Sequence, residues 1–297
     1  NTNGLSYAWD FTDDGADDTN GSDLRIVTNT YVGLGYYSVK LTVTNSAAET
    51  ASVVRVNYIR VAPSTAYASP VGGDIFPYDT WDKAAVNIQN GVDAVMGAPL
   101  QVLVSNGTYN LTAQITLSKP VLLLGVDGAS NTILNVSGSS TRVLFISDPG
   151  AVVDGFTMRN GVGLNDINLP GYGWVSGGGV VSMSGGTIRN CTLMKSYANY
   201  DHMAVAGGVF MTGGRLEFCN IVSNYIASNN GREQGGGIMM TGNSVVENCV
   251  IAYNETRANG YASQDGGAGV WMAAGTTLRN CLIKGNKTVY TGAQQAG

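Results

Sequence analysis

Apolar and polar side chains alternate along much of the first sixty residues. Residues 37–45 (YSVKLTVTN) and residues 51–61 (ASVVRVNYIRV) follow a period of two on either side of a turn-like segment. This period is typical of strands with one buried face, so we expect an antiparallel hairpin. The aromatic run at residues 7–11 (YAWDF) predicts another short strand, and the Asp-, Gly- and Asn-rich residues after it predict a loop.

One later segment has the period of a helix. Apolar residues three or four positions apart mark one face of it: Trp81, Ala85, Ile88, Val92 and Val95. This spacing predicts one amphipathic helix over residues 81–96. From residue 100 onward, short apolar runs are separated by Gly, Asn, Asp and Ser at intervals too short for helices, so we expect strands.

The strongest pattern is an internal repeat. Four segments align around a cysteine, at residues 187–193 (TIRNCTL), 215–221 (RLEFCNI), 245–251 (VVENCVI) and 277–283 (TLRNCLI), so the cysteines recur after 28, 30 and 32 residues. A glycine pair and an apolar residue precede each cysteine, at residues 178–180, 207–209, 236–238 and, with Ala in first place, 268–270. The fifth residue after the cysteine is Ser196 in the first copy and then Asn224, Asn254 and Asn286.

A unit of this length that holds only short strands cannot bury its apolar face alone. It must stack on copies of itself, which predicts a solenoid. Successive coils then lie about 4.8 Å apart, and equivalent residues form ladders of Cys on Cys and Asn on Asn. Glycine is expected where the backbone turns tightly.

The first segment resembles a PKD domain. The residues that carry the resemblance are Trp9-Asp10-Phe11, Tyr31, Gly35-Tyr36-Tyr37 and the strand from Leu41 to Asn45, within residues 5–61. Thr12 departs from the family pattern, which has Gly there, and the loop carries one extra residue. The resemblance implies a small Ig-like β-sandwich, and since strands that precede the WDF strand in the family are missing, we expect the domain to be N-terminally incomplete.

The repeats resemble right-handed parallel β-helix proteins of the pectin-lyase-like superfamily, especially surface proteins whose coils carry Gly-Gly-Val/Ile and Asn-Cys-x-Ile/Leu-x-x-Asn. The resemblance covers about residues 66–297 and implies that the helix caps the N-terminal end of the core. The expected fold class is all-β: a PKD-like β-sandwich over residues 1–62, a linker over 63–80, and a right-handed parallel β-helix solenoid over 81–297 with its capping helix at 81–96. The last coil is expected to be C-terminally incomplete.

Composition narrows the choice of partner. The chain of 297 residues has a formal charge of −5 and only 12% charged residues, so it offers no general basic surface for nucleic acid or anionic lipid. No apolar run reaches the length of a membrane helix, and a secretion signal is not present in this segment. Both resemblances imply an extracellular or cell-surface location.

The cysteine spacing matches neither a C-x-x-C metal site nor a compact disulfide framework. We interpret the four cysteines as a buried ladder of reduced thiols, with a disulfide between neighbouring coils as the alternative.

An acidic loop is the one candidate metal site. Calcium prefers hard carboxylate oxygens on a flexible loop, although the spacing is not that of an EF-hand. The candidate Ca²⁺ ligands, with a solvated turn as the alternative reading, are Asp10, Asp13, Asp14, Asp17 and Asp18.

The variable loops between coils should leave from equivalent corners and project from one face. Aromatic rings and charged groups on an elongated face suit a carbohydrate, because rings stack on sugars and polar groups bind hydroxyls; ordinary polar loops are the alternative. The candidate ligand-binding residues are Tyr172, Trp174, Tyr197, Tyr200, Arg232, Arg257 and Tyr261.

Catalytic candidates are fewer. Glu233 and Asp265 stand at similar distances before their glycine motifs and are expected one coil apart, at about 5 Å, the separation of a retaining glycosidase's carboxylates. Asp201 and His202, the one histidine, lie in another loop. The motifs of polygalacturonases and pectate lyases are absent, and a fold alone does not establish an activity.

The sequence therefore favours an elongated adhesive or structural module of the extracellular space that contacts a polysaccharide or cell-surface glycan, or that self-associates. A polysaccharide lyase or glycoside hydrolase that uses the loop face is the alternative.

Overall fold

A computed structural model describes residues 4–169, 173–200, 203–228, 232–258 and 266–290. The chain divides into two compact units, residues 1–63 and 64–297, and each is considered by itself.

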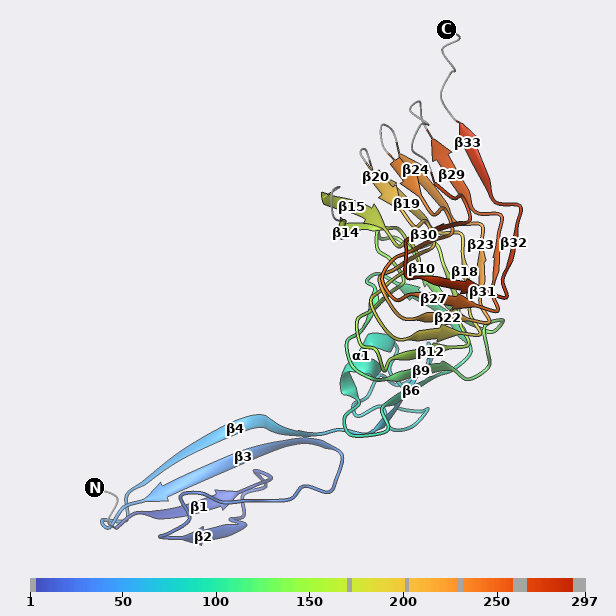
Figure 1. Ribbon diagram of the computed structural model, residues 1–297. Coiled ribbons are helices and arrows are strands. Elements are labelled where there is room, and N and C mark those ends of the chain that lie inside the picture. Colours follow the sequence, from blue (N-terminus) through green and yellow to red (C-terminus); the bar gives the residue numbers. More distant parts are fainter. Residues whose placement is uncertain (1–3, 170–172, 201–202, 229–231, 259–265, 291–297) are drawn as a thin grey trace. The chain divides into compact units, whose positions relative to one another are not determined.

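The first unit contains one antiparallel sheet, sheet A, with the strand order β2-β1-β3-β4 (Figure 1). Its strands are β1 (Ser6–Asp10), β2 (Thr19–Gly21), β3 (Gly35–Thr44) and β4 (Thr50–Val61). The predicted hairpin is confirmed as β3 and β4, and Asn45 closes its turn because its Oδ1 accepts the N–H groups of Ala47 and Glu49, each at 2.9 Å. Within the described residues 4–63 there is one sheet instead of the two expected of a sandwich, because residues 22–34 contain no strand.

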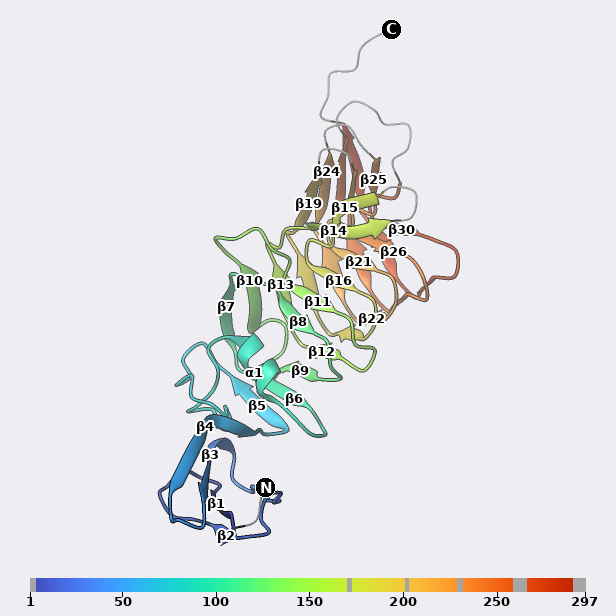
Figure 2. The ribbon, with the colours of Figure 1, turned by 90° about the vertical axis from the view of Figure 1, so that its left-hand side faces the viewer.

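The second unit is built mainly from three parallel sheets, which we name B, C and D (Figure 2). Sheet B contains β5 (Thr65–Ala68), β6 (Gln101–Val104), β9 (Leu122–Gly125), β12 (Val152–Asp154), β17 (Thr187–Arg189), β22 (Arg215–Glu217), β27 (Val245–Glu247) and β31 (Thr277–Arg279). Sheet C contains β7 (Gly107–Leu111), β10 (Thr132–Val136), β13 (Thr157–Arg159), β18 (Thr192–Met194), β23 (Asn220–Val222), β28 (Val250–Ala252) and β32 (Leu282–Lys284). Sheet D contains β8 (Ile115–Leu117), β11 (Leu144–Ile146), β16 (Val181–Met183), β21 (Val209–Met211), β26 (Ile238–Met240) and β30 (Val270–Met272).

The chain visits these sheets in a fixed cyclic order, B then C then D, from β6 onward. Each visit adds one strand next to the strand of the previous visit, so the strands of sheet B lie in chain order from β6 to β31 (Figure 1). We call one passage through B, C and D a repeat. Every strand pair within these three sheets is parallel, as the predicted stacking requires.

Two further sheets extend the later repeats between sheets C and D. Sheet E, which is parallel, contains β19 (Tyr197–Tyr200), β24 (Tyr225–Ser228), β29 (Glu255–Ala258) and β33 (Lys287–Tyr290). Sheet F contains β14 (Leu164–Leu169), β15 (Gly173–Gly177), β20 (Met203–Val205) and β25 (Arg232–Gln234). The two sheets share an apolar contact between Ala198 and Ile226 of sheet E and Ala204 of sheet F, all fully buried.

The predicted helix is present but shorter than expected. It is α1 (Ile88–Ala94), which buries Ile88 and Val92 against the main core, and Asn87 begins it by accepting the Gln89 N–H at 2.9 Å. The expected start at Trp81 is wrong, because Ala85 pairs with Ala68 as a parallel β-bridge and cannot also be helical. Among the described residues, no helix combines the length and apolar character of a membrane span.

The cysteine ladder is confirmed as part of the main core. All four cysteines are free; Cys191, Cys219 and Cys249 are buried and Cys281 is half-buried. A hydrogen bond to the Cys219 thiol and burial raise the pKa of Cys249, and burial is the main cause that raises the pKa of Cys281. Since the thiolate is the reactive form, these side chains act as small apolar residues.

The asparagine ladder joins the repeats by hydrogen bonds at the end of sheet C. Asn254 Nδ2 donates to the Ile221 carbonyl at 2.9 Å, and its Oδ1 accepts the backbone N–H of Asn224 at 3.0 Å. Asn286 Oδ1 in turn accepts the Asn254 N–H at 2.9 Å. Each amide therefore satisfies backbone groups of the preceding repeat as well as its neighbour in the ladder.

The glycines of the repeat are matched to these asparagines. A Cβ on Gly237 would lie 2.8 Å from Asn254 Nδ2 and 2.6 Å from the carbonyl of Gly269 in the next repeat, so no side chain fits there. Gly208 and Asn224 are related in the same way. Glycine is thus required by the close approach of the amide and the next backbone.

The first copy of the glycine motif is placed differently from the sequence alignment. Val181 pairs with Val209, so Val180, and not Gly179, is equivalent to Gly208. The first copy also differs in the ladder, where Ser196 stands in place of asparagine.

We expect Asn254→Ala to lower the free energy of unfolding by about 2–4 kcal/mol, because it leaves a buried N–H and a buried carbonyl without partners. Asn135→Ala is the matched control, since Asn135 bonds to the side chains of Asn110, Arg159 and Asn160 on the outer side of sheet C and satisfies no buried backbone group. Urea unfolding of both variants measures the difference. Equal midpoints would show that the ladder does not hold the repeats together.

Candidate functional site

The acidic loop of the first unit is organised by Asp10 itself. Asp10 is buried, and its carboxylate accepts backbone N–H groups from Asp13 at 2.6 Å and Gly15 at 3.0 Å, among others. Burial opposes ionisation of Asp10, but these hydrogen bonds outweigh it, so its pKa lies below the ordinary value. Asp13, Asp14, Asp17 and Asp18 are exposed.

No group of three or more His, Cys, Asp or Glu residues that could hold a metal ion occurs in the part of the chain that the structure describes. Asp10 is committed to the backbone of its own loop. Calcium binding at this loop stays a prediction.

A second cluster of functional groups lies on sheet E. The sixth residue after each repeat cysteine begins a strand of this sheet, and these residues pair directly across it: Tyr197, Tyr225, Glu255 and Lys287. Alternation along the strands places the next residues, such as Ala198 and Ile226, on the buried side. We call the opposite, solvent-facing side of sheet E the E face.

Two tyrosines and an arginine form a stack on the E face. The rings of Tyr197 and Tyr225 are stacked, with centroids 5.2 Å apart and an interplanar angle of 9°. The guanidinium of Arg257 lies 3.8 Å from the Tyr225 ring centroid. Tyr225 is thus covered by Tyr197 and by a cation, and burial raises its pKa even though the charge of Arg257 opposes that shift.

Glu255 holds two basic side chains in place beside this stack. Arg257 Nε donates to Glu255 Oε2 at 2.9 Å, and Lys287 Nζ lies 3.1 Å from Oε1. Burial raises the pKa of Glu255, but the hydrogen bonds from Arg257 and Lys287 lower it by more, so the net pKa is lowered. The carboxylate therefore orients both cations, which keep 41% and 62% of their side chains exposed.

A cavity of about 510 Å³ opens at the C-terminal part of the E face. Its wall includes Tyr225, Tyr253, Glu255, Arg257 and Lys287. Tyr253 is 57% exposed, and its ring lies over Gly285, where an added Cβ would approach the ring to 2.7 Å. The cavity thus offers one open aromatic ring and two cations against one carboxylate.

This arrangement can bind an anion next to an aromatic surface. Arg257 uses one guanidinium N–H on Glu255, and a guanidinium carries five N–H donors suited to a carboxylate or sulfate. Lys284, whose Nζ lies 6.0 Å from the Tyr253 ring centroid, adds a third cation near that ring. The local charge is therefore positive in a chain with a net charge of −5.

The structure brings together two of the predicted ligand-binding residues, Tyr197 and Arg257, through their common neighbour Tyr225. Trp174 is 61% exposed and lies in β15 of sheet F, whereas Tyr197 and Arg257 lie in sheet E. The first excursion between sheets C and D, β14 and β15, lies in sheet F entirely, whereas the next two leave through sheet E as β19 and β24 and return through sheet F as β20 and β25. Tyr200, Arg232 and Glu233 are placed by their backbone only, in β19 and β25.

The remaining candidates fall outside the described residues. They are Tyr172, Asp201, His202, Tyr261 and Asp265.

Sequence reasoning missed Tyr225, Tyr253, Glu255 and Lys287. A signal was available, because each stands at a fixed distance after a repeat cysteine, four residues for Tyr253 and six for the others. These positions lie inside the repeat and not in the variable loops, where functional residues are more commonly sought.

These features define an all-β protein whose first unit holds an antiparallel sheet and whose second unit is built of stacked parallel sheets. The family model of the PKD domain matches residues 1–58, so this part of the chain is a PKD domain, a module typical of extracellular and cell-surface proteins. No curated protein and no solved structure matches the chain at a significant level.

The lowered pKa of Glu255 predicts a pH dependence of stability. A carboxyl whose pKa is depressed on folding stabilises the protein above its ordinary value of 4.5, and this contribution is lost as the pH falls through the folded value. Glu255→Gln should therefore lower stability at pH 7 and flatten its decline below about pH 4.5. Thermal unfolding from pH 3 to 7 measures this; parallel curves for variant and wild type would show that the ion pairs contribute nothing.

Proposed function

We propose that the second unit is a right-handed parallel β-helix of the pectin-lyase-like type. Three features support the proposal: the fixed order of sheets B, C and D, the Cys and Asn ladders, and α1 against the apolar core. The handedness follows the general preference of parallel strand connections for a right-handed crossover.

On this scaffold, we propose an extracellular adhesive module that binds an acidic polysaccharide through the E face. The observation that carries the proposal is the pair of cations, Arg257 and Lys287, held by Glu255 beside Tyr225 and the open ring of Tyr253. Carboxylate groups along a uronate chain would meet Arg257 and Lys287, and a sugar ring would lie on Tyr253.

The geometry favours an acidic over a neutral glycan. The ring faces of Tyr225 are already covered by Tyr197 and Arg257, which leaves Tyr253 as the open stacking surface. Much of the affinity must then come from the attraction between these cations and the carboxylates of the glycan. Binding should weaken as added salt screens that attraction.

We expect immobilised polygalacturonate and alginate to retain the protein at low salt, and neutral dextran not to retain it. Arg257→Ala should weaken binding by about tenfold, the effect of losing a charge-assisted pair of about 1.4 kcal/mol. Affinity electrophoresis with each polysaccharide measures the change.

Arg189→Ala is the matched control, because Arg189 pairs with Asp154 on sheet B and not on sheet E. Equal retention of Arg257→Ala and wild type, or retention of wild type by dextran alone, would contradict the proposal. Sedimentation without polysaccharide measures the mass of the protein in solution. A mass above that of one chain would show self-association, independently of glycan binding.

A polysaccharide lyase or hydrolase is the second candidate. Gln234 pairs with Gly266 in a parallel bridge, and Glu233 and Asp265 are the residues that precede them in the chain. A carboxylate pair in neighbouring repeats is the arrangement of a retaining glycosidase.

The enzyme is tested by incubating the chain with acidic and neutral polysaccharides, with and without calcium. Lyase products absorb at 235 nm, and hydrolysis releases reducing ends. Glu233→Gln and Asp265→Asn should abolish hydrolysis and leave retention on the glycan intact. Product from the double variant would exclude these two residues as the catalytic pair.

A further inference from the structure

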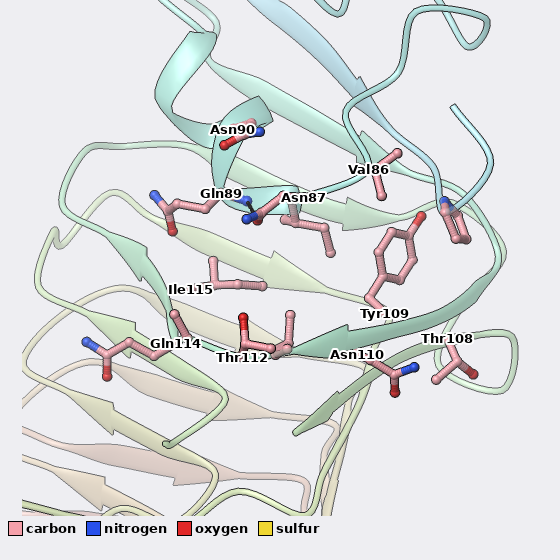
Figure 3. Close-up of a pocket in the computed structure, with 14 residues that line it drawn as sticks. Val86, Asn87, Gln89, Asn90, Thr108, Tyr109, Asn110, Thr112, Gln114 and Ile115 are labelled. Atoms are coloured by element: carbon pink, nitrogen blue, oxygen red, sulfur yellow. Dashed lines mark hydrogen bonds between the residues drawn. The ribbon is translucent and has the colours of Figure 1, made fainter. Parts of the chain in front are cut away.

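A groove lies between α1 and the first strands of sheets C and D, far along the chain from the E face (Figure 3). Its volume is about 440 Å³, within the range of ligand sites in proteins. One wall is the start of α1 with Asn87 and Gln89, and the other wall is the continuous segment of residues 108–115. Tyr109 extends from the strand toward Val86, between the two walls (Figure 3).

The segment along this groove includes the free edge of a sheet. β7 is the last strand of sheet C, with β10 on one side and no strand on the other among the described residues. The Gly107 N–H donates to Asn131 and the Leu111 carbonyl accepts from Ser137, so residues 107, 109 and 111 point their backbone groups toward the β10 side. By alternation, the N–H and C=O groups of Thr108 and Asn110 point toward the open side.

The neighbouring strand shows what such an edge requires. Thr116, the middle residue of β8, exchanges two hydrogen bonds with the side-chain amide of Gln89: its N–H donates to Oε1 at 2.7 Å, and its carbonyl accepts from Nε2 at 3.3 Å. Gln89 thus takes the place of a paired strand on β8. Within the described part of the chain, no such bond reaches the outward backbone groups of Thr108 or Asn110.

The groove has defined ends and no charge. Pro70 closes it at the start of β7, where a Cβ on Gly107 would lie 2.7 Å from the Pro70 ring, and Gln89 with Gln114 closes it at β8. Gln114 Oε1 is buried there without a hydrogen-bond partner. No lining residue is charged, and the strand β7 itself contains no lysine or proline of the kind that usually protects a free strand from pairing.

We propose that this groove is a strand-addition site, in which an extended peptide segment of another protein pairs with the free edge of β7 beneath α1. Main-chain hydrogen bonds to Thr108 and Asn110 supply the affinity. The peptide is about five residues long where it pairs, the length of β7, and it is uncharged because the groove is. The apolar surface that the groove offers to the peptide is Val86, which is 46% exposed, because Tyr109, Ile88 and Ile115 are almost fully buried; we therefore expect apolar residues to alternate in the peptide.

The test uses a phage-displayed library of random twelve-residue peptides, selected on the full chain. We expect enriched peptides to be uncharged and to alternate apolar residues. Synthetic copies are then methylated at alternate backbone nitrogens in one register or the other. Methylation in one register should weaken binding about tenfold or more, because it removes the N–H groups that face β7, and methylation in the other register should not.

Thr112→Trp fills the groove, since the Thr112 side chain points toward α1 (Figure 3), and should weaken the same peptides by a similar factor. Ser130→Trp, at an exposed turn before β10, is the matched control and should bind as wild type. Thermal unfolding verifies that both variants are folded, and the methylated peptides test the proposal on wild type alone.

Three results would overturn the proposal. They are a selection without enrichment, enriched peptides that tolerate methylation in both registers, and peptides that bind Thr112→Trp unchanged. Maltohexaose and cellohexaose are titrated in parallel. Binding of either sugar that Thr112→Trp abolishes, without peptide binding, would assign the groove to a neutral glycan instead.

Discussion

The register between repeats is the constraint on which the second unit depends. Short strands of three to five residues have little stability alone, and each must be held beside its equivalent in the next repeat. Asn224, Asn254 and Asn286 do this by bonding both to one another and to backbone groups of the preceding repeat. Because the amide and the next backbone approach so closely, the equivalent place in the glycine motif, Gly208 or Gly237, has no room for a side chain.

The E face depends on the same register. A parallel sheet puts equivalent residues of successive repeats side by side, so one position can build a row of side chains at strand spacing. At the sixth position after the cysteine, this row is two tyrosines, a glutamate and a lysine. The guanidinium of Arg257 packs on the ring of the second tyrosine. The structural ladder thereby arranges groups from several repeats into one cavity.

The first strands of a stack have no earlier strand beside them. Their outer backbone groups and the exposed end of the apolar core must be covered in another way. α1 covers the apolar core with Ile88 and Val92, and Gln89 pairs with β8 in place of a strand. The edge of β7 lacks such a substitute, which makes it chemically distinct from the rest of sheet C. In the PKD domain, the backbone N–H groups of the acidic loop also need partners. The buried Asp10 carboxylate accepts hydrogen bonds from four of them.

The sequence by itself determined what depends on local and periodic order. The hairpin of β3 and β4, the strand-rich second unit, the buried cysteines and the asparagine ladder all follow from spacing, because equivalent residues of a stacked repeat must coincide. The tertiary structure alone decided which excursion strands joined sheet E and which joined sheet F, and so put Trp174 in a different sheet from Tyr197 and Arg257. It also decided where α1 begins, since the pairing of Ala85 with Ala68 overrides the helical spacing around Trp81, and it placed Val180 opposite Gly208. These outcomes depend on contacts between residues far apart in the chain, which a local pattern does not contain.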